Sequence, residues 1–424
     1  MWSATSIEAR LGFPGISTRR VLARSSATGQ ALLPTGSATP FGSDGWSGPT
    51  EPGCVAGWLA MTTTSRLLGT LAATALATAV ALGAPTANAA PSRASARAAD
   101  GLSWDLLSTP TSTASLRGLS AVSQKIVWAG GSEGTILRSV DGGRTVTSVG
   151  PTGTSDLQFR SLYGSSARHA VAAAIGATPD AMRVYVTEDG GQTWVKSQQN
   201  ALPTAFYDCM TFTNKKEGYI LSDPVDGKFL ILKTTDGGHS WTQLPSSGMP
   251  AALDGEFGFA ASGTCINANA RGDLFFGTGG VNPGRIFRST DGGLTWTVQD
   301  SMVAGSGAGG IFSLSFGPGR AGVAVGGDFT LPEAAIANAA WTNDMGQSWQ
   351  PATGLGGYRS GSAWMDGFHN AVLAVGTSGS DVSWDGGRTY STFDTGTFNA
   401  VDCVPGACYA AGAQGRLARL HLAR

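Results

Sequence analysis

Three arginines and five carboxylates stand at comparable points of this chain and could together bind a polar ligand. Only 13% of the 424 residues are charged, so charged side chains at comparable positions are informative. Guanidinium groups bind carboxylates and phosphates through paired hydrogen bonds, and carboxylates bind hydroxyl and amino groups. The eight residues are Arg117, Arg160, Asp208, Asp223, Glu256, Asp328, Arg359 and Asp381. We expect them to form a ligand-binding site or, alternatively, ion pairs that only organise neighbouring loops.

Other kinds of chemical site find little support in the sequence. It contains neither the H-E-x-x-H motif of zinc hydrolases nor a P-loop. The histidines show no metal-binding spacing, and no metal site is expected from His169, His239, His369 and His421. No dinucleotide fingerprint is present, so no cofactor is expected. The formal net charge of −1 gives no basic surface for nucleic acid.

An eight-residue motif of the form S/T-x-D-x-G-x-S/T-W indicates which elements position these residues. Its six aspartates recur roughly every 50 residues, a period typical of propeller blades, and are Asp141, Asp189, Asp236, Asp291, Asp344 and Asp385. The last copy has Tyr390 in place of the Trp, and the first has Val146. Each copy lies between two short β-rich runs. The Asp can accept hydrogen bonds from backbone N–H groups two or three residues on, and the glycines allow positive φ, which predicts a structural turn.

Each repeat contains four predicted strands, as in the third, where they cover 207–212, 218–222, 229–233 and 241–244. The first strands begin at seven places, near Arg117, Arg160, Tyr207, Ala260, Phe312, Arg359 and Asn399. The seventh unit, 398–422, has only three strands, and the segment 104–108 can supply the fourth. The sequence therefore predicts an all-β, seven-bladed β-propeller of four-stranded antiparallel blades, with its ring closed by the mature N-terminal strand.

A propeller has two different faces. The loops between blades and those between second and third strands open on one of them, which we call the inter-blade-loop face. The turns that carry the repeated motif lie on the opposite side, the box face. The eight candidate residues are predicted to lie at the mouth of the axial channel on the inter-blade-loop face, because they start first strands or end second strands.

The N-terminal part differs from the repeats in composition. Residues 1–60 are rich in Gly, Ser, Thr and Pro, and we expect them to be disordered and to precede a true translation start at Met61. Residues 61–89 have a basic residue, an apolar run and an A-x-A site that ends at Ala89, which indicates a secretory signal peptide. A retained membrane anchor is the alternative. After cleavage, 90–100 would be a short linker and 101–424 the propeller, secreted or in the cell envelope, with no stable membrane span.

The mature chain keeps four cysteines, an even number that suits disulfides in an oxidising compartment. Cys403 and Cys408 flank a four-residue turn and are predicted to pair across a hairpin. Cys209 and Cys265 occupy similar places in consecutive repeats. They could bridge neighbouring blades or remain small buried thiols.

The six motifs resemble the Asp-box, or bacterial neuraminidase, repeat of β-propellers. Beyond them, residues 102–422 are similar to bacterial propellers related to the photosystem II stability and assembly factor. Stretches that carry this similarity include Phe159-Arg160-Ser161-Leu162 and Val325-Gly326-Gly327-Asp328. The resemblance implies a binding or assembly module, most simply a monomer without catalysis, that holds a protein or a small-molecule or glycan ligand.

Two enzymatic alternatives remain at this stage. The distant sialidase resemblance would make Arg117, Arg160 and Arg359 an arginine triad near Tyr207, Glu256 and Asp208. However, the Arg-Ile-Pro motif of that superfamily is absent from the first blade, which reads Arg117-Gly118-Leu119. The second alternative is an oxidoreductase with a bound cofactor, for which the sequence offers no fingerprint.

Overall fold

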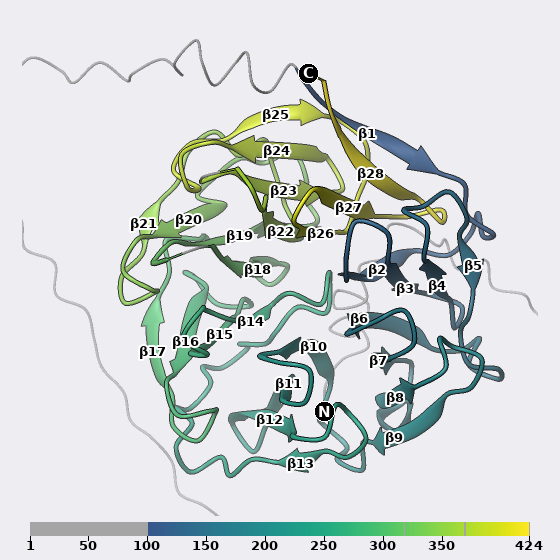
Figure 1. Ribbon diagram of the computed structural model, residues 1–424. Coiled ribbons are helices and arrows are strands. Elements are labelled where there is room, and N and C mark those ends of the chain that lie inside the picture. The colour runs from purple at the N-terminus through teal and green to yellow at the C-terminus, as the bar shows by residue number, and fades with distance from the viewer. Residues whose placement is uncertain (1–100, 318, 369, 424) are drawn as a thin grey trace, which may run out of the picture. The chain divides into compact units, whose positions relative to one another are not determined.

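The computed structural model describes residues 101–317, 319–368 and 370–423, and these form seven four-stranded antiparallel sheets arranged in a ring (Figure 1). The predictions made for 1–60, 61–89 and 90–100 fall outside the described residues. The predicted all-β, seven-bladed propeller is confirmed. In the described ranges, no helix has the length and apolar character needed to cross a membrane.

Each blade contributes one strand to each of four concentric positions. The innermost strands are β2 (Leu116–Ala121), β6 (Gln158–Gly164), β10 (Tyr207–Phe212), β14 (Ile266–Ala268), β18 (Gly309–Phe316), β22 (Gly361–Trp364) and β26 (Ala400–Val404). The second strands are β3 (Val127–Gly131), β7 (Ala170–Ile175), β11 (Gly218–Val225), β15 (Leu274–Gly277), β19 (Gly322–Asp328), β23 (Val372–Gly376) and β27 (Ala407–Ala411).

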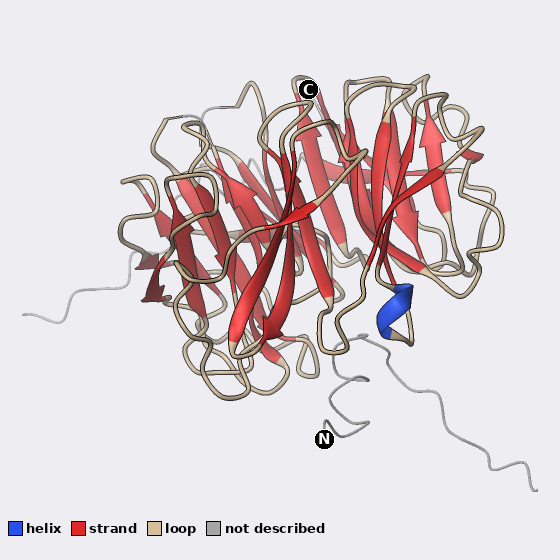
Figure 2. Ribbon diagram, turned by 90° about the horizontal axis from the view of Figure 1, so that it is seen from below, coloured by secondary structure: helices blue, strands red, loops and turns tan. Residues whose placement is uncertain are grey.

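The outer half of each blade completes the antiparallel sheet. The third strands are β4 (Ile136–Ser139), β8 (Arg183–Thr187), β12 (Lys228–Thr234), β16 (Arg285–Ser289), β20 (Ala339–Thr342), β24 (Gly379–Ser383) and β28 (Leu417–Leu422). The outermost strands are β5 (Thr147–Ser148), β9 (Val195–Gln199), β13 (Thr242–Gln243), β17 (Thr297–Asp300), β21 (Gln350–Pro351), β25 (Ser391–Asp394) and β1 (Leu102–Leu107). Figure 2 shows the strands between two layers of loops, with the short helix η1 (Pro179–Ala181) on the inter-blade-loop face.

The ring is closed by β1, which pairs with β28 as the outer strand of the seventh blade. The register places Leu102 opposite Leu422 and Trp104 opposite Leu420. Trp104 also reaches the neighbouring blade, where its indole N–H donates to Ser380 Oγ at 3.0 Å. The prediction that the N-terminal strand completes the last blade is therefore confirmed, with the strand at 102–107 rather than 104–108.

The repeated motif is a self-contained turn. In the fourth-blade copy, Asp291 Oδ1 accepts hydrogen bonds from the N–H groups of Leu294 and Thr295 at 3.0 and 2.9 Å, three and four residues on. Asp291 Oδ2 accepts from the Thr295 hydroxyl at 2.6 Å. These bonds from Thr295 lower the pKa of Asp291 to about 2. Gly292 and Gly293 take φ values of +73° and +89°, which glycine adopts without strain. The aspartate thus acts structurally, as expected.

Two disulfides join the described cysteines. Cys403–Cys408 closes the hairpin between β26 and β27, where the two residues are also strand partners. Cys209–Cys265 joins β10 of the third blade to the residue preceding β14 of the fourth. The predicted hairpin pairing is confirmed, and the alternative of free thiols at Cys209 and Cys265 is wrong.

Candidate functional site

The segment 257–264, which precedes β14, crosses the middle of the ring instead of forming the first strand predicted near Ala260. The Ala260 carbonyl accepts from Arg160 Nη1 at 2.7 Å and the Ala261 carbonyl from Arg117 Nη1 at 3.3 Å, which ties the segment to blades 1 and 2. On the other side, Phe259 stacks on Phe312 of blade 5 with ring centroids 3.7 Å apart. Because one short segment contacts blades on opposite sides, it crosses the axis of the ring (Figure 1). We call it the central plug.

Four of the eight predicted residues, Arg117, Arg160, Asp208 and Asp223, gather around the central plug and form what we call the axial charge cluster. Arg160 is only 2% exposed, and its guanidinium donates to Gln158 Oε1 at 3.1 and 2.7 Å. Burial and the positive charge of Arg117 lower the pKa of Arg160, and the nearby Asp208 opposes this shift. Asp223 Oδ1 accepts from the N–H of Gly258 at 3.0 Å. The cluster therefore fastens the plug to three blades.

Arg359, the third predicted arginine, bonds to Asp381. Its Nε lies 2.6 Å from Asp381 Oδ2, and both side chains are fully buried. Its Nη1 donates to the carbonyl of Tyr358 and to Ser378 Oγ at 2.9 and 2.8 Å. Arg359 and Asp381 therefore form a separate ion pair within blade 6, in which Asp381 lies inside β24 rather than in the preceding turn.

Glu256 and Asp328 fix loops on the inter-blade-loop face. Glu256 Oε1 accepts from Arg285 Nε at 2.9 Å and from Thr278 Oγ1 at 2.6 Å, while Oε2 accepts from the N–H of Leu253 at 2.9 Å. Asp328 Oδ2 accepts from Ser306 Oγ at 2.5 Å, and Oδ1 accepts from the N–H of Thr330 at 2.9 Å. The two carboxylates thus set the shapes of four loops around blades 4 and 5.

These loops expose large apolar side chains that the sequence reasoning missed. Leu253, Met302, Leu331 and Ile336 are between 44% and 74% exposed, and we call them the apolar loop patch. The loops are joined by backbone hydrogen bonds from Phe257 to Gly279, from Gly280 to Gly309 and from Ala304 to Ala337. The sequence did contain a sign of this surface. Leu331 and Ile336 are large apolar residues that lie outside the repeated strand pattern, where they are not needed to build the core.

A cavity of about 270 Å³ lies on the other side of the central plug. It is lined by the ends of β2, β6 and β10 that point to the box face, by residues 262–264 of the plug and by Asp402 of β26. Burial raises the pKa of the Asp402 carboxyl to about 6, although the N–H groups of Ala121 and Cys403 donate to it at 2.8 and 2.9 Å. Asp402 was not among the site residues predicted from the sequence.

Solved structures with similar folds include proteins of different functions. The structure of YCF48 bound to D1 peptide is 16% identical, with a TM-score of 0.54, and the match covers 76% of this chain and 95% of that one. YCF48 from Cyanidioschyzon merolae is also 16% identical, with a TM-score of 0.51 and coverage of 75% and 98%. A streptogramin B lyase is 15% identical, with a TM-score of 0.55 and coverage of 77% and 99%. At these identities the similarity shows the fold alone.

The sequence comparisons identify the family. The search of curated proteins gave no match. Residues 72–314, more than half of the chain, match the family described as the DUF6242 beta propeller domain. Together with the seven observed blades, this match shows that the chain belongs to the DUF6242 beta propeller domain family.

Proposed function

We propose that this propeller is an exported, non-catalytic binding module that holds a protein partner at the apolar loop patch of its inter-blade-loop face. The exposure of Leu253, Met302, Leu331 and Ile336 on mutually bonded loops is the observation that carries the proposal. Large exposed apolar side chains on adjoining loops of one face are typical of interaction surfaces. The exposed carboxylates of Asp254 and Glu333 lie on the same loops. A partner segment with apolar and basic side chains would suit this surface best.

Three members of the axial charge cluster are too deeply buried to act as catalytic groups. A catalytic group must touch its substrate, whereas Arg160, Asp208 and Asp223 are almost completely buried. Their charges stabilise the central plug and, through it, the blades around the channel. Within the cluster, Arg117 is partly exposed and could still contact a ligand at the channel mouth. On this proposal, the axial charge cluster stabilises the fold that carries the binding surface and does not itself contact the partner, apart from Arg117.

The similar structures and the disulfides give further support. One similar propeller is described as bound to a peptide, so a propeller of this fold can hold a peptide. The Cys209–Cys265 and Cys403–Cys408 disulfides suit an oxidising compartment. Export through a signal peptide at residues 61–89, which is part of this proposal, would bring the chain to such a compartment. The fold, the exposed apolar side chains and the disulfides are therefore all consistent with a binding role outside the cytosol.

Selection from a displayed random-peptide library tests the proposal with the full chain. The wild-type protein should select peptides that combine apolar and basic residues. The double variant Leu331→Ser/Ile336→Ser should weaken binding of the selected peptides by about tenfold or more, because it removes two exposed apolar anchors. The matched control is Val140→Ser/Leu294→Ser, which removes similarly exposed apolar side chains from the box face.

Equal loss in both double variants would contradict the assignment of the patch. A fluorogenic sialic acid and glycoside panel should show no turnover with the wild-type protein. Turnover that the substitution Tyr207→Phe abolishes would contradict the non-catalytic part of the proposal and favour the sialidase alternative.

A further inference from the structure

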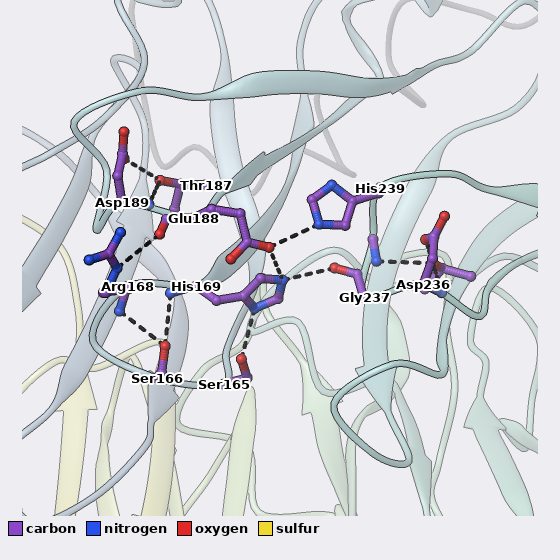
Figure 3. A network of polar contacts seen from close by, with 12 residues as sticks. Ser165, Ser166, Arg168, His169, Thr187, Glu188, Asp189, Asp236, Gly237 and His239 are labelled. Atoms are coloured by element: carbon purple, nitrogen blue, oxygen red, sulfur yellow. Dashed lines mark hydrogen bonds and ion pairs between the residues drawn. The ribbon is translucent and has the colours of Figure 1, made fainter.

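Three metal-ligating side chains meet on the box face between blades 2 and 3, away from the apolar loop patch and the axial charge cluster. His169 directly precedes β7, Glu188 follows β8, and His239 lies in the repeated turn of blade 3. His239 Nε2 lies 2.9 Å from Glu188 Oε1, and His169 Nε2 lies 3.6 Å from the same oxygen (Figure 3). The three donor atoms are all within 4.8 Å of one another.

The donor types and separations suit a tetrahedral metal ion. Zn²⁺ binds imidazole nitrogen at about 2.0–2.1 Å, which places neighbouring donors about 3.3 Å apart. The separations of 2.9 and 3.6 Å lie on either side of this value. We propose that His169, Glu188 and His239 bind one divalent transition-metal cation of the Zn²⁺ type. Because Glu188 and His239 are exposed, the fourth ligand of such an ion would come from water or from a partner's side chain.

His169 has the outer hydrogen-bond partner that a metal-binding imidazole needs. A histidine that binds metal through Nε2 carries its proton on Nδ1 and donates it to a nearby oxygen. Ser165 Oγ lies 2.8 Å from His169 Nδ1 and can accept that proton. In the metal-free protein the Ser165 hydroxyl can donate to Nδ1 instead, while Nε2–H donates to the Gly237 carbonyl at 3.0 Å. The Ser165 hydroxyl can therefore form a hydrogen bond with Nδ1 in either tautomer of His169.

The backbone beneath the three ligands is fixed by hydrogen bonds. The N–H of His169 donates to Ser166 Oγ at 2.9 Å, and Arg168 Nε donates to the Glu188 carbonyl at 3.2 Å. In blade 3, the N–H of Gly237 donates to the Lys216 carbonyl at 2.9 Å. The ligands thus project from ordered turns of two blades, as a preorganised site requires. A bound ion would link blade 2 to blade 3 outside the channel.

This inference departs from the sequence expectation, which found no metal-binding spacing among the histidines. His169 lies in a turn between first and second strands, whereas His239 lies in a turn between third and fourth strands. Only the packing of neighbouring blades brings such turns together. The chain also provides a matched control, because His421 Nδ1 lies 3.6 Å from Asp105 Oδ2 on the propeller edge. That pair has one histidine and one carboxylate and lacks the third ligand.

Zinc titration of the untagged, chelator-treated full chain tests the site. Calorimetry should give one Zn²⁺ per chain, and Zn²⁺ should raise the melting temperature of the wild-type protein. His239→Ala and Glu188→Gln should each weaken Zn²⁺ binding by more than about tenfold, and Ser165→Ala by about tenfold, as observed for ligands and outer-shell partners elsewhere. His421→Ala should leave the affinity and stoichiometry unchanged.

The melting temperature of each variant without metal shows whether the fold is intact. Glu188 and His239 are exposed, so their substitution should leave that temperature within a few degrees of wild type. Absence of stoichiometric Zn²⁺ binding by the wild-type chain would overturn the proposal. Equal weakening by His421→Ala and His239→Ala, or wild-type affinity in Glu188→Gln, would overturn it as well.

Discussion

At the scale of single residues, this propeller moves the pKa values of its aspartates in opposite directions. The turn aspartates Asp189, Asp236 and Asp291 have their pKa values lowered to about 2. Hydroxyl and backbone N–H donors cause these low values. Burial instead raises the pKa of Asp402 to about 6 at the cavity beside the plug. The turn aspartates and Asp402 thus differ because hydrogen-bond donors dominate at the turns and burial dominates at Asp402.

We predict that Asp402 titrates near pH 6 in the folded protein. Its folded pKa lies above the unfolded value of about 3.9, so its contribution to stability is complete below pH 4 and is lost as the pH rises through 6. At neutral pH the unfolding free energy is therefore lower than below pH 4 by at most about 3 kcal/mol on account of this group. Carboxyl ¹³C NMR across this range should show one aspartate with a midpoint near 6.

The Asp402→Asn variant identifies that resonance, because the signal should be missing from its spectrum. A folded protein in which every aspartate titrates below pH 5 would contradict the burial argument.

The sequence predicted which residues carry charge near strand ends, but it could not predict their partners. Arg117 and Arg160 were expected beside Arg359, yet the first two bond to the central plug and the third bonds to Asp381. The reason is physical. A side chain at the start of a first strand can point toward the axis or into its own blade. Which orientation it takes depends on the segment that lies at the axis, here the central plug. Nothing in the local sequence around Arg359 specifies that.

At the scale of elements, the central plug is the feature that separates this ring from a simple repetition of blades. The repeat predicted a first strand near Ala260, at the place where the other repeats begin theirs. In the structure, Phe259 stacks on Phe312, and the strand starts only at Ile266. Tertiary contacts across the ring thus override a local pattern that is correct in the other blades.

Gly258 lies against Asp208 with no room for a side chain, and we predict that Gly258→Ala destabilises the protein. A Cβ atom at this position would lie 2.7 Å from Asp208 Oδ2 and 2.8 Å from its Cγ. Overpacking of this kind costs roughly 1–3 kcal/mol. The urea midpoint should fall accordingly. Gly307→Ala is the control, because a Cβ atom there meets nothing within 4 Å.

The control variant should keep the wild-type midpoint or exceed it slightly, since alanine restricts the unfolded chain. If both variants unfold at the wild-type urea concentration, the plug does not pack against Asp208 as described.

At the scale of the whole molecule, the closed ring was the most predictable property of the chain. Six copies of one turn motif implied repeated blades, and a seventh unit with three strands implied a strand borrowed from the other end. Both follow from covalent order and repetition, which the sequence displays directly. The patch formed by Leu253, Met302, Leu331 and Ile336 was not predicted, because loop conformation depends on carboxylates such as Glu256 that bond to neighbouring blades.

Closure by β1 makes the stability of the ring depend on its first strand, and we predict that a chain starting at residue 110 is much less stable than one starting at residue 101. Without β1, β28 becomes an exposed sheet edge, and such edges promote aggregation. Loss of Trp104 removes its hydrogen bond to Ser380 and its ring contact with Phe398 at 5.3 Å, which together should cost roughly 3 kcal/mol or more. Urea unfolding and size-exclusion chromatography measure both effects.

A synthetic peptide of residues 101–109 should restore the urea midpoint of the shorter chain when added in excess, because it can pair with β28. The same peptide with Trp104→Ala should restore less, and an equal midpoint for both chains without peptide would mean that the remaining blades hold the ring closed by themselves.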